Sequence, residues 1–260
     1  HRKDILLEMS QALKNSDAPA ALAHEAIHDT VVGILDGLPR GVVLDVPAGE
    51  GALAARLVKL GFDVRCCDLY TEIFKLKDTR IDRGNLDERL PYDDLSFDGV
   101  VCVEGLEHIE NPANAIREFD RVLKPGGVLI VSVPNIMNIE ERLKWLFNGY
   151  TSHFKPLSAS VRASIATEFG GMDEIALHVN PIGYSELRYL LEKSGFAVEG
   201  TFIDKPKRKS FLYLPLVWLI RFVGALSSSE KRSARWTREL NSAPVLLGGN
   251  TLISKAVKHG

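Results

Sequence analysis

The stretch VVLDVPAGEGALAARL, residues 42–57, decides the fold. It starts as a short buried strand, passes through a turn with glycines at 49 and 51, and continues as a helix. Glycine lets the backbone approach a ligand where a Cβ would collide, and the following helix presents its free N–H groups at the same place. We therefore expect this turn to hold a small ligand that carries a phosphate or a ribose.

Strands and helices alternate along the chain on both sides of this turn. Strand patterns occupy residues 42–46, 63–69, 97–106, 128–134, 197–203 and 252–258. Helical periodicity occupies residues 4–14, 20–37, 50–60, 111–123, 141–147 and 184–196. Short connections between alternating strands and helices predict an α/β fold with a mostly parallel sheet that helices cover on both faces.

The rhythm of the pattern divides the chain into parts. We expect N-terminal helices over 1–39, a core over 40–135, an insertion over 136–183 and a C-terminal part of the core over 184–260. The last part carries its own insertion at 205–247.

Composition narrows the class of protein. With 260 residues, 45% hydrophobic residues and 25% charged residues, the chain is predicted to be globular. The net charge of −2 argues against a general nucleic-acid binder. Cys66, Cys67 and Cys102 lie in apolar, strand-like runs and give neither a disulfide framework nor a metal spacing. They predict a reducing, cytoplasmic compartment.

The glycine turn fits two classes of cofactor when it is taken alone. GEGALA, residues 49–54, satisfies the dinucleotide pattern G-x-G-x-x-A, and Asp68 stands where a ribose-binding acid would stand. An NAD-dependent oxidoreductase is therefore one interpretation. Asp45, however, comes before the glycines, where its charge would repel a pyrophosphate and would suit a ligand with a cationic group.

Six motifs follow one another in a familiar order. They are DVPAGEG (45–51), CCDL (66–69), GNL (84–86), LPYDDLSFDGVVCVEGLEHI (90–109), LKPGG (123–127) and SVPN (132–135). Over residues 40–135 this series closely resembles the class I S-adenosylmethionine (SAM)-dependent methyltransferases of the Methyltransf_11 type, and 184–196 adds a weaker similarity. The resemblance implies a Rossmann-like seven-stranded sheet in the order 3-2-1-4-5-7-6, with helices on both faces and inserted lid segments.

The same resemblance implies SAM as the cofactor and a set of residues that bind it. Asp45 would lie near the ammonium of the methionine part, and Asp68 would accept both ribose hydroxyls through its two oxygens. Pro47 departs from the family pattern, which has a glycine there. The implied cofactor-binding residues are Asp45, Ala48, Gly49, Gly51, Asp68, Leu69, Asn85, Leu86, Glu104 and Gly105.

The segment EGLEHI, residues 104–109, supplies the candidate catalytic residues. We name His108, Glu107 and His178 for this role and no metal ligand. His108 has three interpretations: a hydrogen bond that closes a loop, a general base, or a metal ligand. The E-x-x-E-H spacing resembles metal-assisted O-methyltransferases of quinone pathways and of small-RNA 3′ ends. In those enzymes a divalent cation bridges neighbouring hydroxyls of the acceptor.

The resemblance leaves the acceptor open. The 136–183 insertion stands where the family places its acceptor lid, and its aromatic residues suit a flat or lipid-like molecule. We expect methyl transfer to a hydroxyl of a small or lipid-linked acceptor, such as a quinone precursor or an envelope glycan or lipid. Besides the oxidoreductase, the alternative is a catalytically silent SAM-binding protein that tethers a membrane.

The most apolar run of the chain is SFLYLPLVWLIRFVGAL, residues 210–226, between two basic segments. From 205 to 238 there are nine Lys or Arg residues and one acid, Glu230. A cationic, tryptophan-containing amphipathic segment is typical of a helix that rests on anionic lipid. We expect membrane-surface contact through 205–238, at the inner face of a membrane. The alternatives are packing against the edge of the sheet and a homodimer interface.

Overall fold

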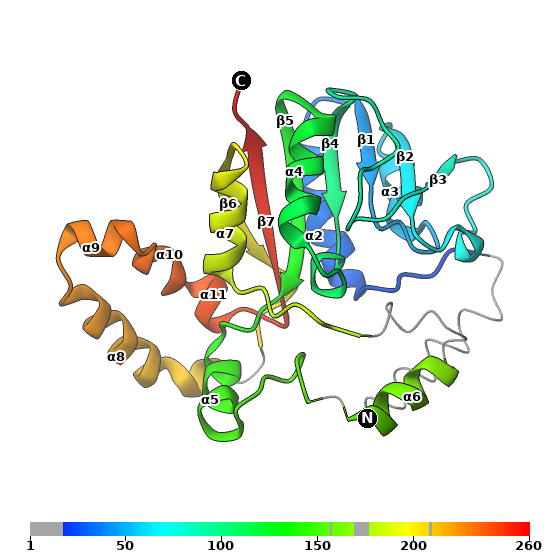
Figure 1. Cartoon of the computed structure of the whole chain (residues 1–260). Coiled ribbons are helices and arrows are strands. Elements are labelled where there is room, and N and C mark those ends of the chain that lie inside the picture. Colours follow the sequence, from blue (N-terminus) through cyan, green and yellow to red (C-terminus); the bar gives the residue numbers. More distant parts are fainter. Residues whose placement is uncertain (1–17, 157, 169–176, 208–209) are drawn as a thin grey trace.

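The computed structural model describes residues 18–156, 158–168, 177–207 and 210–260, and it contains one seven-stranded sheet in the order β3-β2-β1-β4-β5-β7-β6 (Figure 1). The strands are β1 (Val42–Asp45), β2 (Asp63–Asp68), β3 (Ile81–Arg83), β4 (Phe97–Cys102), β5 (Leu123–Pro134), β6 (Phe196–Ile203) and β7 (Thr251–Lys258). All neighbours pair in parallel except β7, which runs antiparallel to β5 and β6. This confirms the predicted fold class and strand order.

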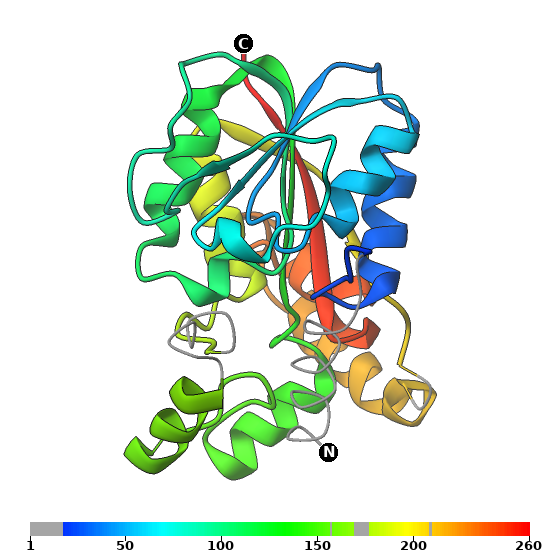
Figure 2. The same ribbon diagram turned by 90° about the vertical axis from the view of Figure 1, so that its right-hand side faces the viewer.

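Helices cover both faces of the sheet, because alternate residues of its strands point to opposite sides. Figure 2 shows the sheet edge-on between two helical layers. The helices α2 (Glu25–Asp36) and α3 (Ala52–Lys59) pack on one face, with Val43 and Val101. The helices α4 (Pro112–Val122) and α7 (Tyr184–Lys193) pack on the other, with Leu44 and Val100.

Helix starts follow from local capping. Asn111 caps α4 by accepting a hydrogen bond from the backbone N–H of Asn114, and Pro112 occupies the first turn, as the sequence predicts. The helix predicted over 20–37 begins only at Glu25, because the His24 side chain caps α2 by accepting from Ala26 N. Residues 18–24 form an irregular segment.

Three further expectations differ from the structure. The strand predicted over 97–106 ends at Cys102, because Glu104 has a φ of 48° and turns the chain away from the sheet. The LKPGG segment belongs to β5, which starts at Leu123 rather than at residue 128. The short strand β3 was missed, since the stretch around it is polar. The helix predicted over 4–14 lies outside the described residues.

The two insertions lie at the carboxyl end of the parallel strands, below the sheet in Figures 1 and 2. The first contains α5 (Ile139–Asn148) and α6 (Ala159–Glu168). The second contains η4 (Ser210–Tyr213), α8 (Leu214–Ala225), α9 (Ser229–Ala234), α10 (Thr237–Leu240) and α11 (Ala243–Leu247). The boundaries of the four-part division remain a prediction.

Candidate active site

A cavity of about 550 Å³ lies at the carboxyl ends of the strands, where the strand order reverses between β1 and β4. Ligands of open α/β sheets bind at such a reversal. Nine of the ten predicted cofactor-binding residues line this cavity. They are Asp45, Ala48, Gly49, Asp68, Leu69, Asn85, Leu86, Glu104 and Gly105.

Gly51 is the exception, because it is not among the residues that line the cavity. It is the N-cap of α3 with a φ of 92°, and a Cβ there would approach the Phe74 ring to 2.7 Å. Gly51 therefore serves the turn and its close packing, and its role in binding the cofactor stays a prediction.

Hydrogen bonds to both flanking strands hold the glycine turn in place. Val46 N donates to Val101 O on β4 at 3.0 Å, and Ala48 N donates to Cys67 O on β2 at 3.0 Å. Gly49 has a φ of 54°. The backbone of the turn is therefore fixed by the sheet itself.

Pro47, which departs from the family pattern, lies against Gly105 of the β4 loop. A Cβ at residue 105 would come within 2.6 Å of Pro47 Cδ and 3.0 Å of Cys102 Sγ. The proline ring fills the space that a side chain at 105 would need. Position 47 can therefore hold a proline in place of the family's glycine because residue 105, in the loop after β4, is itself a glycine.

Asp45 carries an unusual carboxyl at the end of β1. The residue is 1% exposed, and its Oδ2 has no hydrogen-bond partner among the described residues. Burial raises the pKa of Asp45 to about 8, and the charge of Asp68 contributes to this rise. A buried carboxylate without a partner is costly, and a cationic group in the cavity would relieve that cost.

Asp68, at the end of β2, joins the second strand to the glycine turn. Its Oδ2 accepts from Gly49 N at 2.8 Å and its Oδ1 accepts from Tyr70 N at 2.9 Å. Burial raises the pKa of Asp68, while these hydrogen bonds lower it. A carboxylate has about four acceptor positions, so each oxygen retains capacity for one more donor.

The segment before α2 also contributes to the cavity, which the sequence analysis missed. Ala20, Leu22 and His24 line it. The Ala20 N–H donates to the buried Glu50 Oε2 at 2.8 Å, and Lys75 pairs with the same oxygen at 3.0 Å. A Cβ at Gly49 would lie 2.9 Å from Leu22, so this segment covers the glycine turn. No pattern in residues 18–24 points to this contact.

Glu104 lies on the cavity wall directly after β4. Its backbone N–H donates to Ser132 Oγ at 2.8 Å, and the same hydroxyl donates to Glu104 Oε1 at 3.1 Å. Burial raises the pKa of Glu104 to about 7. Its positive φ is uncommon outside glycine and typical of residues held for a function.

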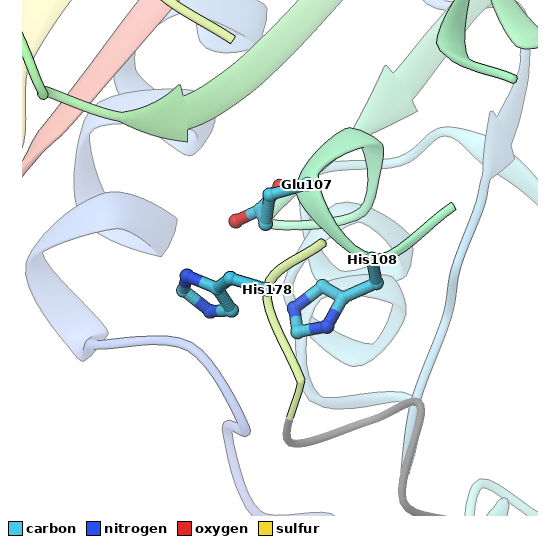
Figure 3. A group of neighbouring side chains, drawn as sticks. All are labelled: Glu107, His108 and His178. Carbon is cyan, nitrogen blue, oxygen red and sulfur yellow. The ribbon is translucent and has the colours of Figure 1, made fainter. Parts of the chain in front are cut away.

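The three predicted catalytic residues lie close together beside the cavity. Figure 3 shows Glu107 and the His108 ring, from the short helix η2 (Leu106–His108), close to the His178 ring. The two rings meet edge to face with centroids 4.7 Å apart, and His153 stacks on His178 at 6.1 Å. His108, His153 and His178 line the cavity, whereas Glu107 lies behind them and is 0% exposed.

Backbone hydrogen bonds bring His178 to η2 from a distant part of the sequence. Val179 N and Asn180 N both donate to Glu107 O, at 2.8 and 3.1 Å. His108 Nδ1 lies 2.9 Å from Leu177 O. Since a carbonyl only accepts, Nδ1 carries the proton, and in the neutral ring Nε2 then holds the lone pair.

Glu107 gives this cluster its chemistry. Neither carboxyl oxygen has a hydrogen-bond partner among the described residues. Burial raises the pKa of Glu107 well above its ordinary value, and the charge of Glu104 adds to this. Three possible ligand atoms lie within 4.8 Å of one another, one each from Glu107, His108 and His178. A carboxylate with two imidazoles is a donor set that fits a divalent cation.

Replacing Asp45 by asparagine is expected to stabilise the ligand-free protein at pH 8, with a melting temperature about 3–8 °C higher. Unfolding returns the Asp45 pKa from about 8 to about 3.8, so the unfolded chain releases this proton first as pH rises. The resulting loss of stability grows between these two pH values. The amide of an asparagine at this position has no such proton to release.

Thermal melts of both proteins from pH 4.5 to 8.5 check this expectation. The difference in melting temperature should be small near pH 4.5 and largest near pH 8. An Asp45→Asn variant that melts below the unchanged protein at pH 8 would show that the carboxylate has a stabilising partner.

The chain is similar to known proteins over its core. Residues 44–131 match the family described as methyltransferase domain. The ubiquinone biosynthesis O-methyltransferase of Psychrobacter cryohalolentis is 32% identical over 168 residues, which are 56% of this chain and 65% of that protein. The protein of the same name from Xanthomonas campestris pv. campestris is 37% identical over 109 residues, 38% and 45% of the two chains. The chain thus spans less than two thirds of these relatives.

Solved structures share the fold at low identity. A SAM-dependent methyltransferase from Archaeoglobus fulgidus superposes with a TM-score of 0.54 at 15% identity, over 89% of this chain and 94% of that one. The [4+2]-cyclase SpnF gives a TM-score of 0.55 at 17% identity, over 98% and 92%. Together with the family match, the sheet order identifies the class I methyltransferase fold.

Proposed function

We propose that this chain is a class I SAM-dependent methyltransferase that transfers a methyl group to a hydroxyl of a small or lipid-linked acceptor. The proposal starts from residues 44–131, which match the methyltransferase domain family. A quinone precursor or an envelope glycan or lipid is the acceptor class. The observation that carries the proposal is a single cavity that both the predicted cofactor-binding residues and the predicted catalytic histidines line. Asp45 and Asp68 line it, and so do His108 and His178.

The residues at the glycine turn fit SAM. The buried Asp45 carboxyl, whose Oδ2 has no partner among the described residues, suits the ammonium of its amino-acid part. Asp68 keeps acceptor capacity for two ribose hydroxyls, while Leu69 offers an apolar surface to the base. A pyrophosphate, as in NAD, would offer no cation to the buried Asp45 carboxyl, whose pKa is raised to about 8, and this argues against the oxidoreductase.

The chemistry asks two things of the protein. Bound SAM supplies a methyl group on a positively charged sulfur, and an acceptor oxygen displaces that sulfur in line. Most of the rate can then come from holding donor and acceptor close and aligned. The hydroxyl must also lose its proton, and His108, which lines the cavity, would accept it through Nε2, the nitrogen left with a lone pair when Nδ1 donates to Leu177 O.

Glu107 and His178 assist His108 in this proposal. The unpartnered carboxylate and the second imidazole also suit a divalent cation, which would lower the pKa of a coordinated hydroxyl. The sequence alone placed the metal behind both hydrogen-bonded loop closure and base catalysis. The grouping of three donor atoms, with both Glu107 oxygens lacking partners among the described residues, supports the cation as an alternative to base catalysis, since His108 Nε2 cannot hold a cation and accept the proton at once.

Isothermal titration tests the cofactor part of the proposal. SAM and S-adenosylhomocysteine are expected to bind with a micromolar dissociation constant, and NADH is expected not to bind. The reverse result would support the oxidoreductase. The control is the same titration with adenosine, which lacks the amino-acid part and should bind at least about 10-fold more weakly without the Asp45 contact.

Label transfer tests the reaction. With methyl-labelled SAM, a catechol bearing a short prenyl tail is expected to gain label as a methyl ether. A thiol and an amine of similar size serve as controls and should stay unlabelled. Tight binding of SAM with no labelled product from phenol, glycan or lipid hydroxyls would instead support a catalytically silent binding protein.

A further inference from the structure

Exposed apolar side chains gather on one part of the molecule. Of the sixteen large hydrophobic side chains that are exposed among the described residues, eleven lie on α5, on η4 or within 214–226, so their placement is not scattered. We call these eleven the apolar ridge. They are Trp145, Leu146, Phe147, Phe211, Leu212, Leu214, Trp218, Leu219, Phe222, Val223 and Leu226.

The helix α8 presents a continuous apolar stripe to solvent. Trp218, Phe222 and Leu226 follow one another at intervals of four residues, and Leu219 and Val223 lie beside them. Trp218 is 74% exposed and Phe222 63%. Within α8 only Val217 is fully buried. The helix therefore packs through its other side and leaves this stripe uncovered by the described part of the chain.

The first insertion extends the same surface. Lys207, just before η4, pairs with Glu140 of α5 at 2.5 Å. Phe147 of α5 and Tyr213 of η4 line a common groove of about 350 Å³. Figure 1 shows α5 next to the start of α8, below the carboxyl end of the sheet. The two insertions thus form one face at the end of the molecule that holds the cavity.

A basic flank accompanies the apolar ridge. Arg221 lies on α8, Lys231 on α9, and Arg235 and Arg238 follow shortly after; all four are exposed. Lys231, Arg235 and Arg238 form no ion pair with any described residue. Glu230 is the single acid from 205 to 238, so the flank carries a strong local positive charge on a chain of net charge −2.

We infer that the apolar ridge and its basic flank dock on the surface of an anionic lipid bilayer. A bilayer matches both features at once, because apolar side chains enter the headgroup region while Lys and Arg meet anionic headgroups. A second copy of this chain would instead bring the same positive charge against itself. The inference concerns binding only, and it goes beyond the proposed methyl transfer.

The dimensions of α8 agree with a helix that lies in the interface. Twelve residues span about 18 Å at 1.5 Å per residue, while the hydrocarbon core is about 30 Å thick. Within the described residues, no helix combines the length and hydropathy that crossing a bilayer requires. Two of the three tryptophans, Trp145 and Trp218, lie on the ridge, and tryptophan concentrates at membrane interfaces.

Vesicle co-sedimentation tests the inference with the full chain. Vesicles of phosphatidylcholine with 30% phosphatidylglycerol are expected to bind at least about 10-fold more tightly than vesicles of phosphatidylcholine alone, and 0.5 M salt should abolish the difference. Tryptophan fluorescence should shift to the blue on binding. Equal binding to both kinds of vesicle, or no binding to either, would overturn the inference.

Variants of the apolar ridge test its part in vesicle binding apart from that of the basic flank. Trp218→Glu with Phe222→Glu is expected to lower binding at least about 20-fold. A matched pair on α3 and α7, Val58→Glu with Tyr189→Glu, replaces exposed apolar residues away from the ridge and should have no effect. Melting temperatures check that both proteins fold. Equal losses in the two pairs would contradict the inference.

Replacing the charges tests the flank. The triple variant Lys231→Ala, Arg235→Ala, Arg238→Ala is expected to bind the anionic vesicles about 100-fold more weakly at 50 mM salt. Each Lys or Arg near an anionic surface contributes about 1 kcal/mol to the free energy of binding. Sedimentation velocity completes the design. A dimer that the Trp218→Glu, Phe222→Glu pair converts to monomer, without vesicle binding, would assign the ridge to a second copy. These readouts need no cofactor or acceptor, so they stand apart from the proposed function.

Discussion

Replacing Asp68 by alanine is expected to weaken binding of S-adenosylhomocysteine by about 100- to 1,000-fold. The carboxylate would accept two ribose hydroxyls, and each hydrogen bond to a charged group contributes about 1.5–3 kcal/mol. Alanine also removes the acceptor for Gly49 N and Tyr70 N, so the turn and the second strand lose one of their connections. Isothermal titration measures the change.

Two further variants make this test specific. Asp63→Ala removes an exposed aspartate from the opposite end of the same strand, and it should leave the affinity within about twofold. Asp68→Asn keeps an acceptor oxygen and should give an intermediate loss. An unchanged affinity in a folded Asp68→Ala protein would place the adenosyl site elsewhere and remove the basis of the proposed function.

Replacing His108 by alanine is expected to lower turnover with a hydroxyl acceptor by at least about 100-fold, with the affinity for S-adenosylhomocysteine unchanged. His108 lines the same cavity as Asp45 and Asp68, and in the proposed arrangement it would act on the acceptor and not on the cofactor. His24→Ala is the matched control, since His24 also lines the cavity but caps α2. Its turnover should stay within about threefold. Full turnover in His108→Ala would leave His108 with the loop-closing role.

Removal of divalent cations distinguishes the two ways in which the cluster could act. Treatment with a chelator followed by desalting is expected to lower turnover about as much as His108→Ala, and Mg²⁺ or Zn²⁺ should restore it. The reason is the buried Glu107 carboxylate beside two imidazoles. Full turnover after chelation would contradict the cation and leave His108 as a base alone.

The sequence predicted the fold well where local patterns carry the information. Alternating strands and helices, with glycines at the first turn, were sufficient for the sheet and its two layers. The resemblance to the methyltransferase family supplied the strand order, which periodicity alone does not specify. The short strand β3 escaped because its three residues, Ile81–Arg83, pair only with β2 at the edge and carry no clear alternation.

The candidate site could be predicted in part. The nine predicted cofactor-binding residues that line the cavity lie in short sequence motifs at or just after the ends of β1, β2, β3 and β4, and the family resemblance identified them from those motifs. The proximity of His178 to His108 depends on backbone pairing of 179–180 with Glu107, which no local pattern reveals. The same is true of Leu22 over Gly49. Gly51 and Glu107 do not line the cavity, and their predicted roles in binding and catalysis stay predictions.

The attachment of the glycine turn to β2 and β4 has a thermodynamic consequence. Val46 and Ala48 donate their backbone N–H groups to the two strands that flank β1, so the peptide adopts its shape when the sheet forms. The conformational entropy of this loop is therefore lost during folding and does not reduce ligand affinity a second time. A rigid, preorganised binding loop of this kind also increases selectivity, because its backbone does not rearrange to bind a ligand of different shape.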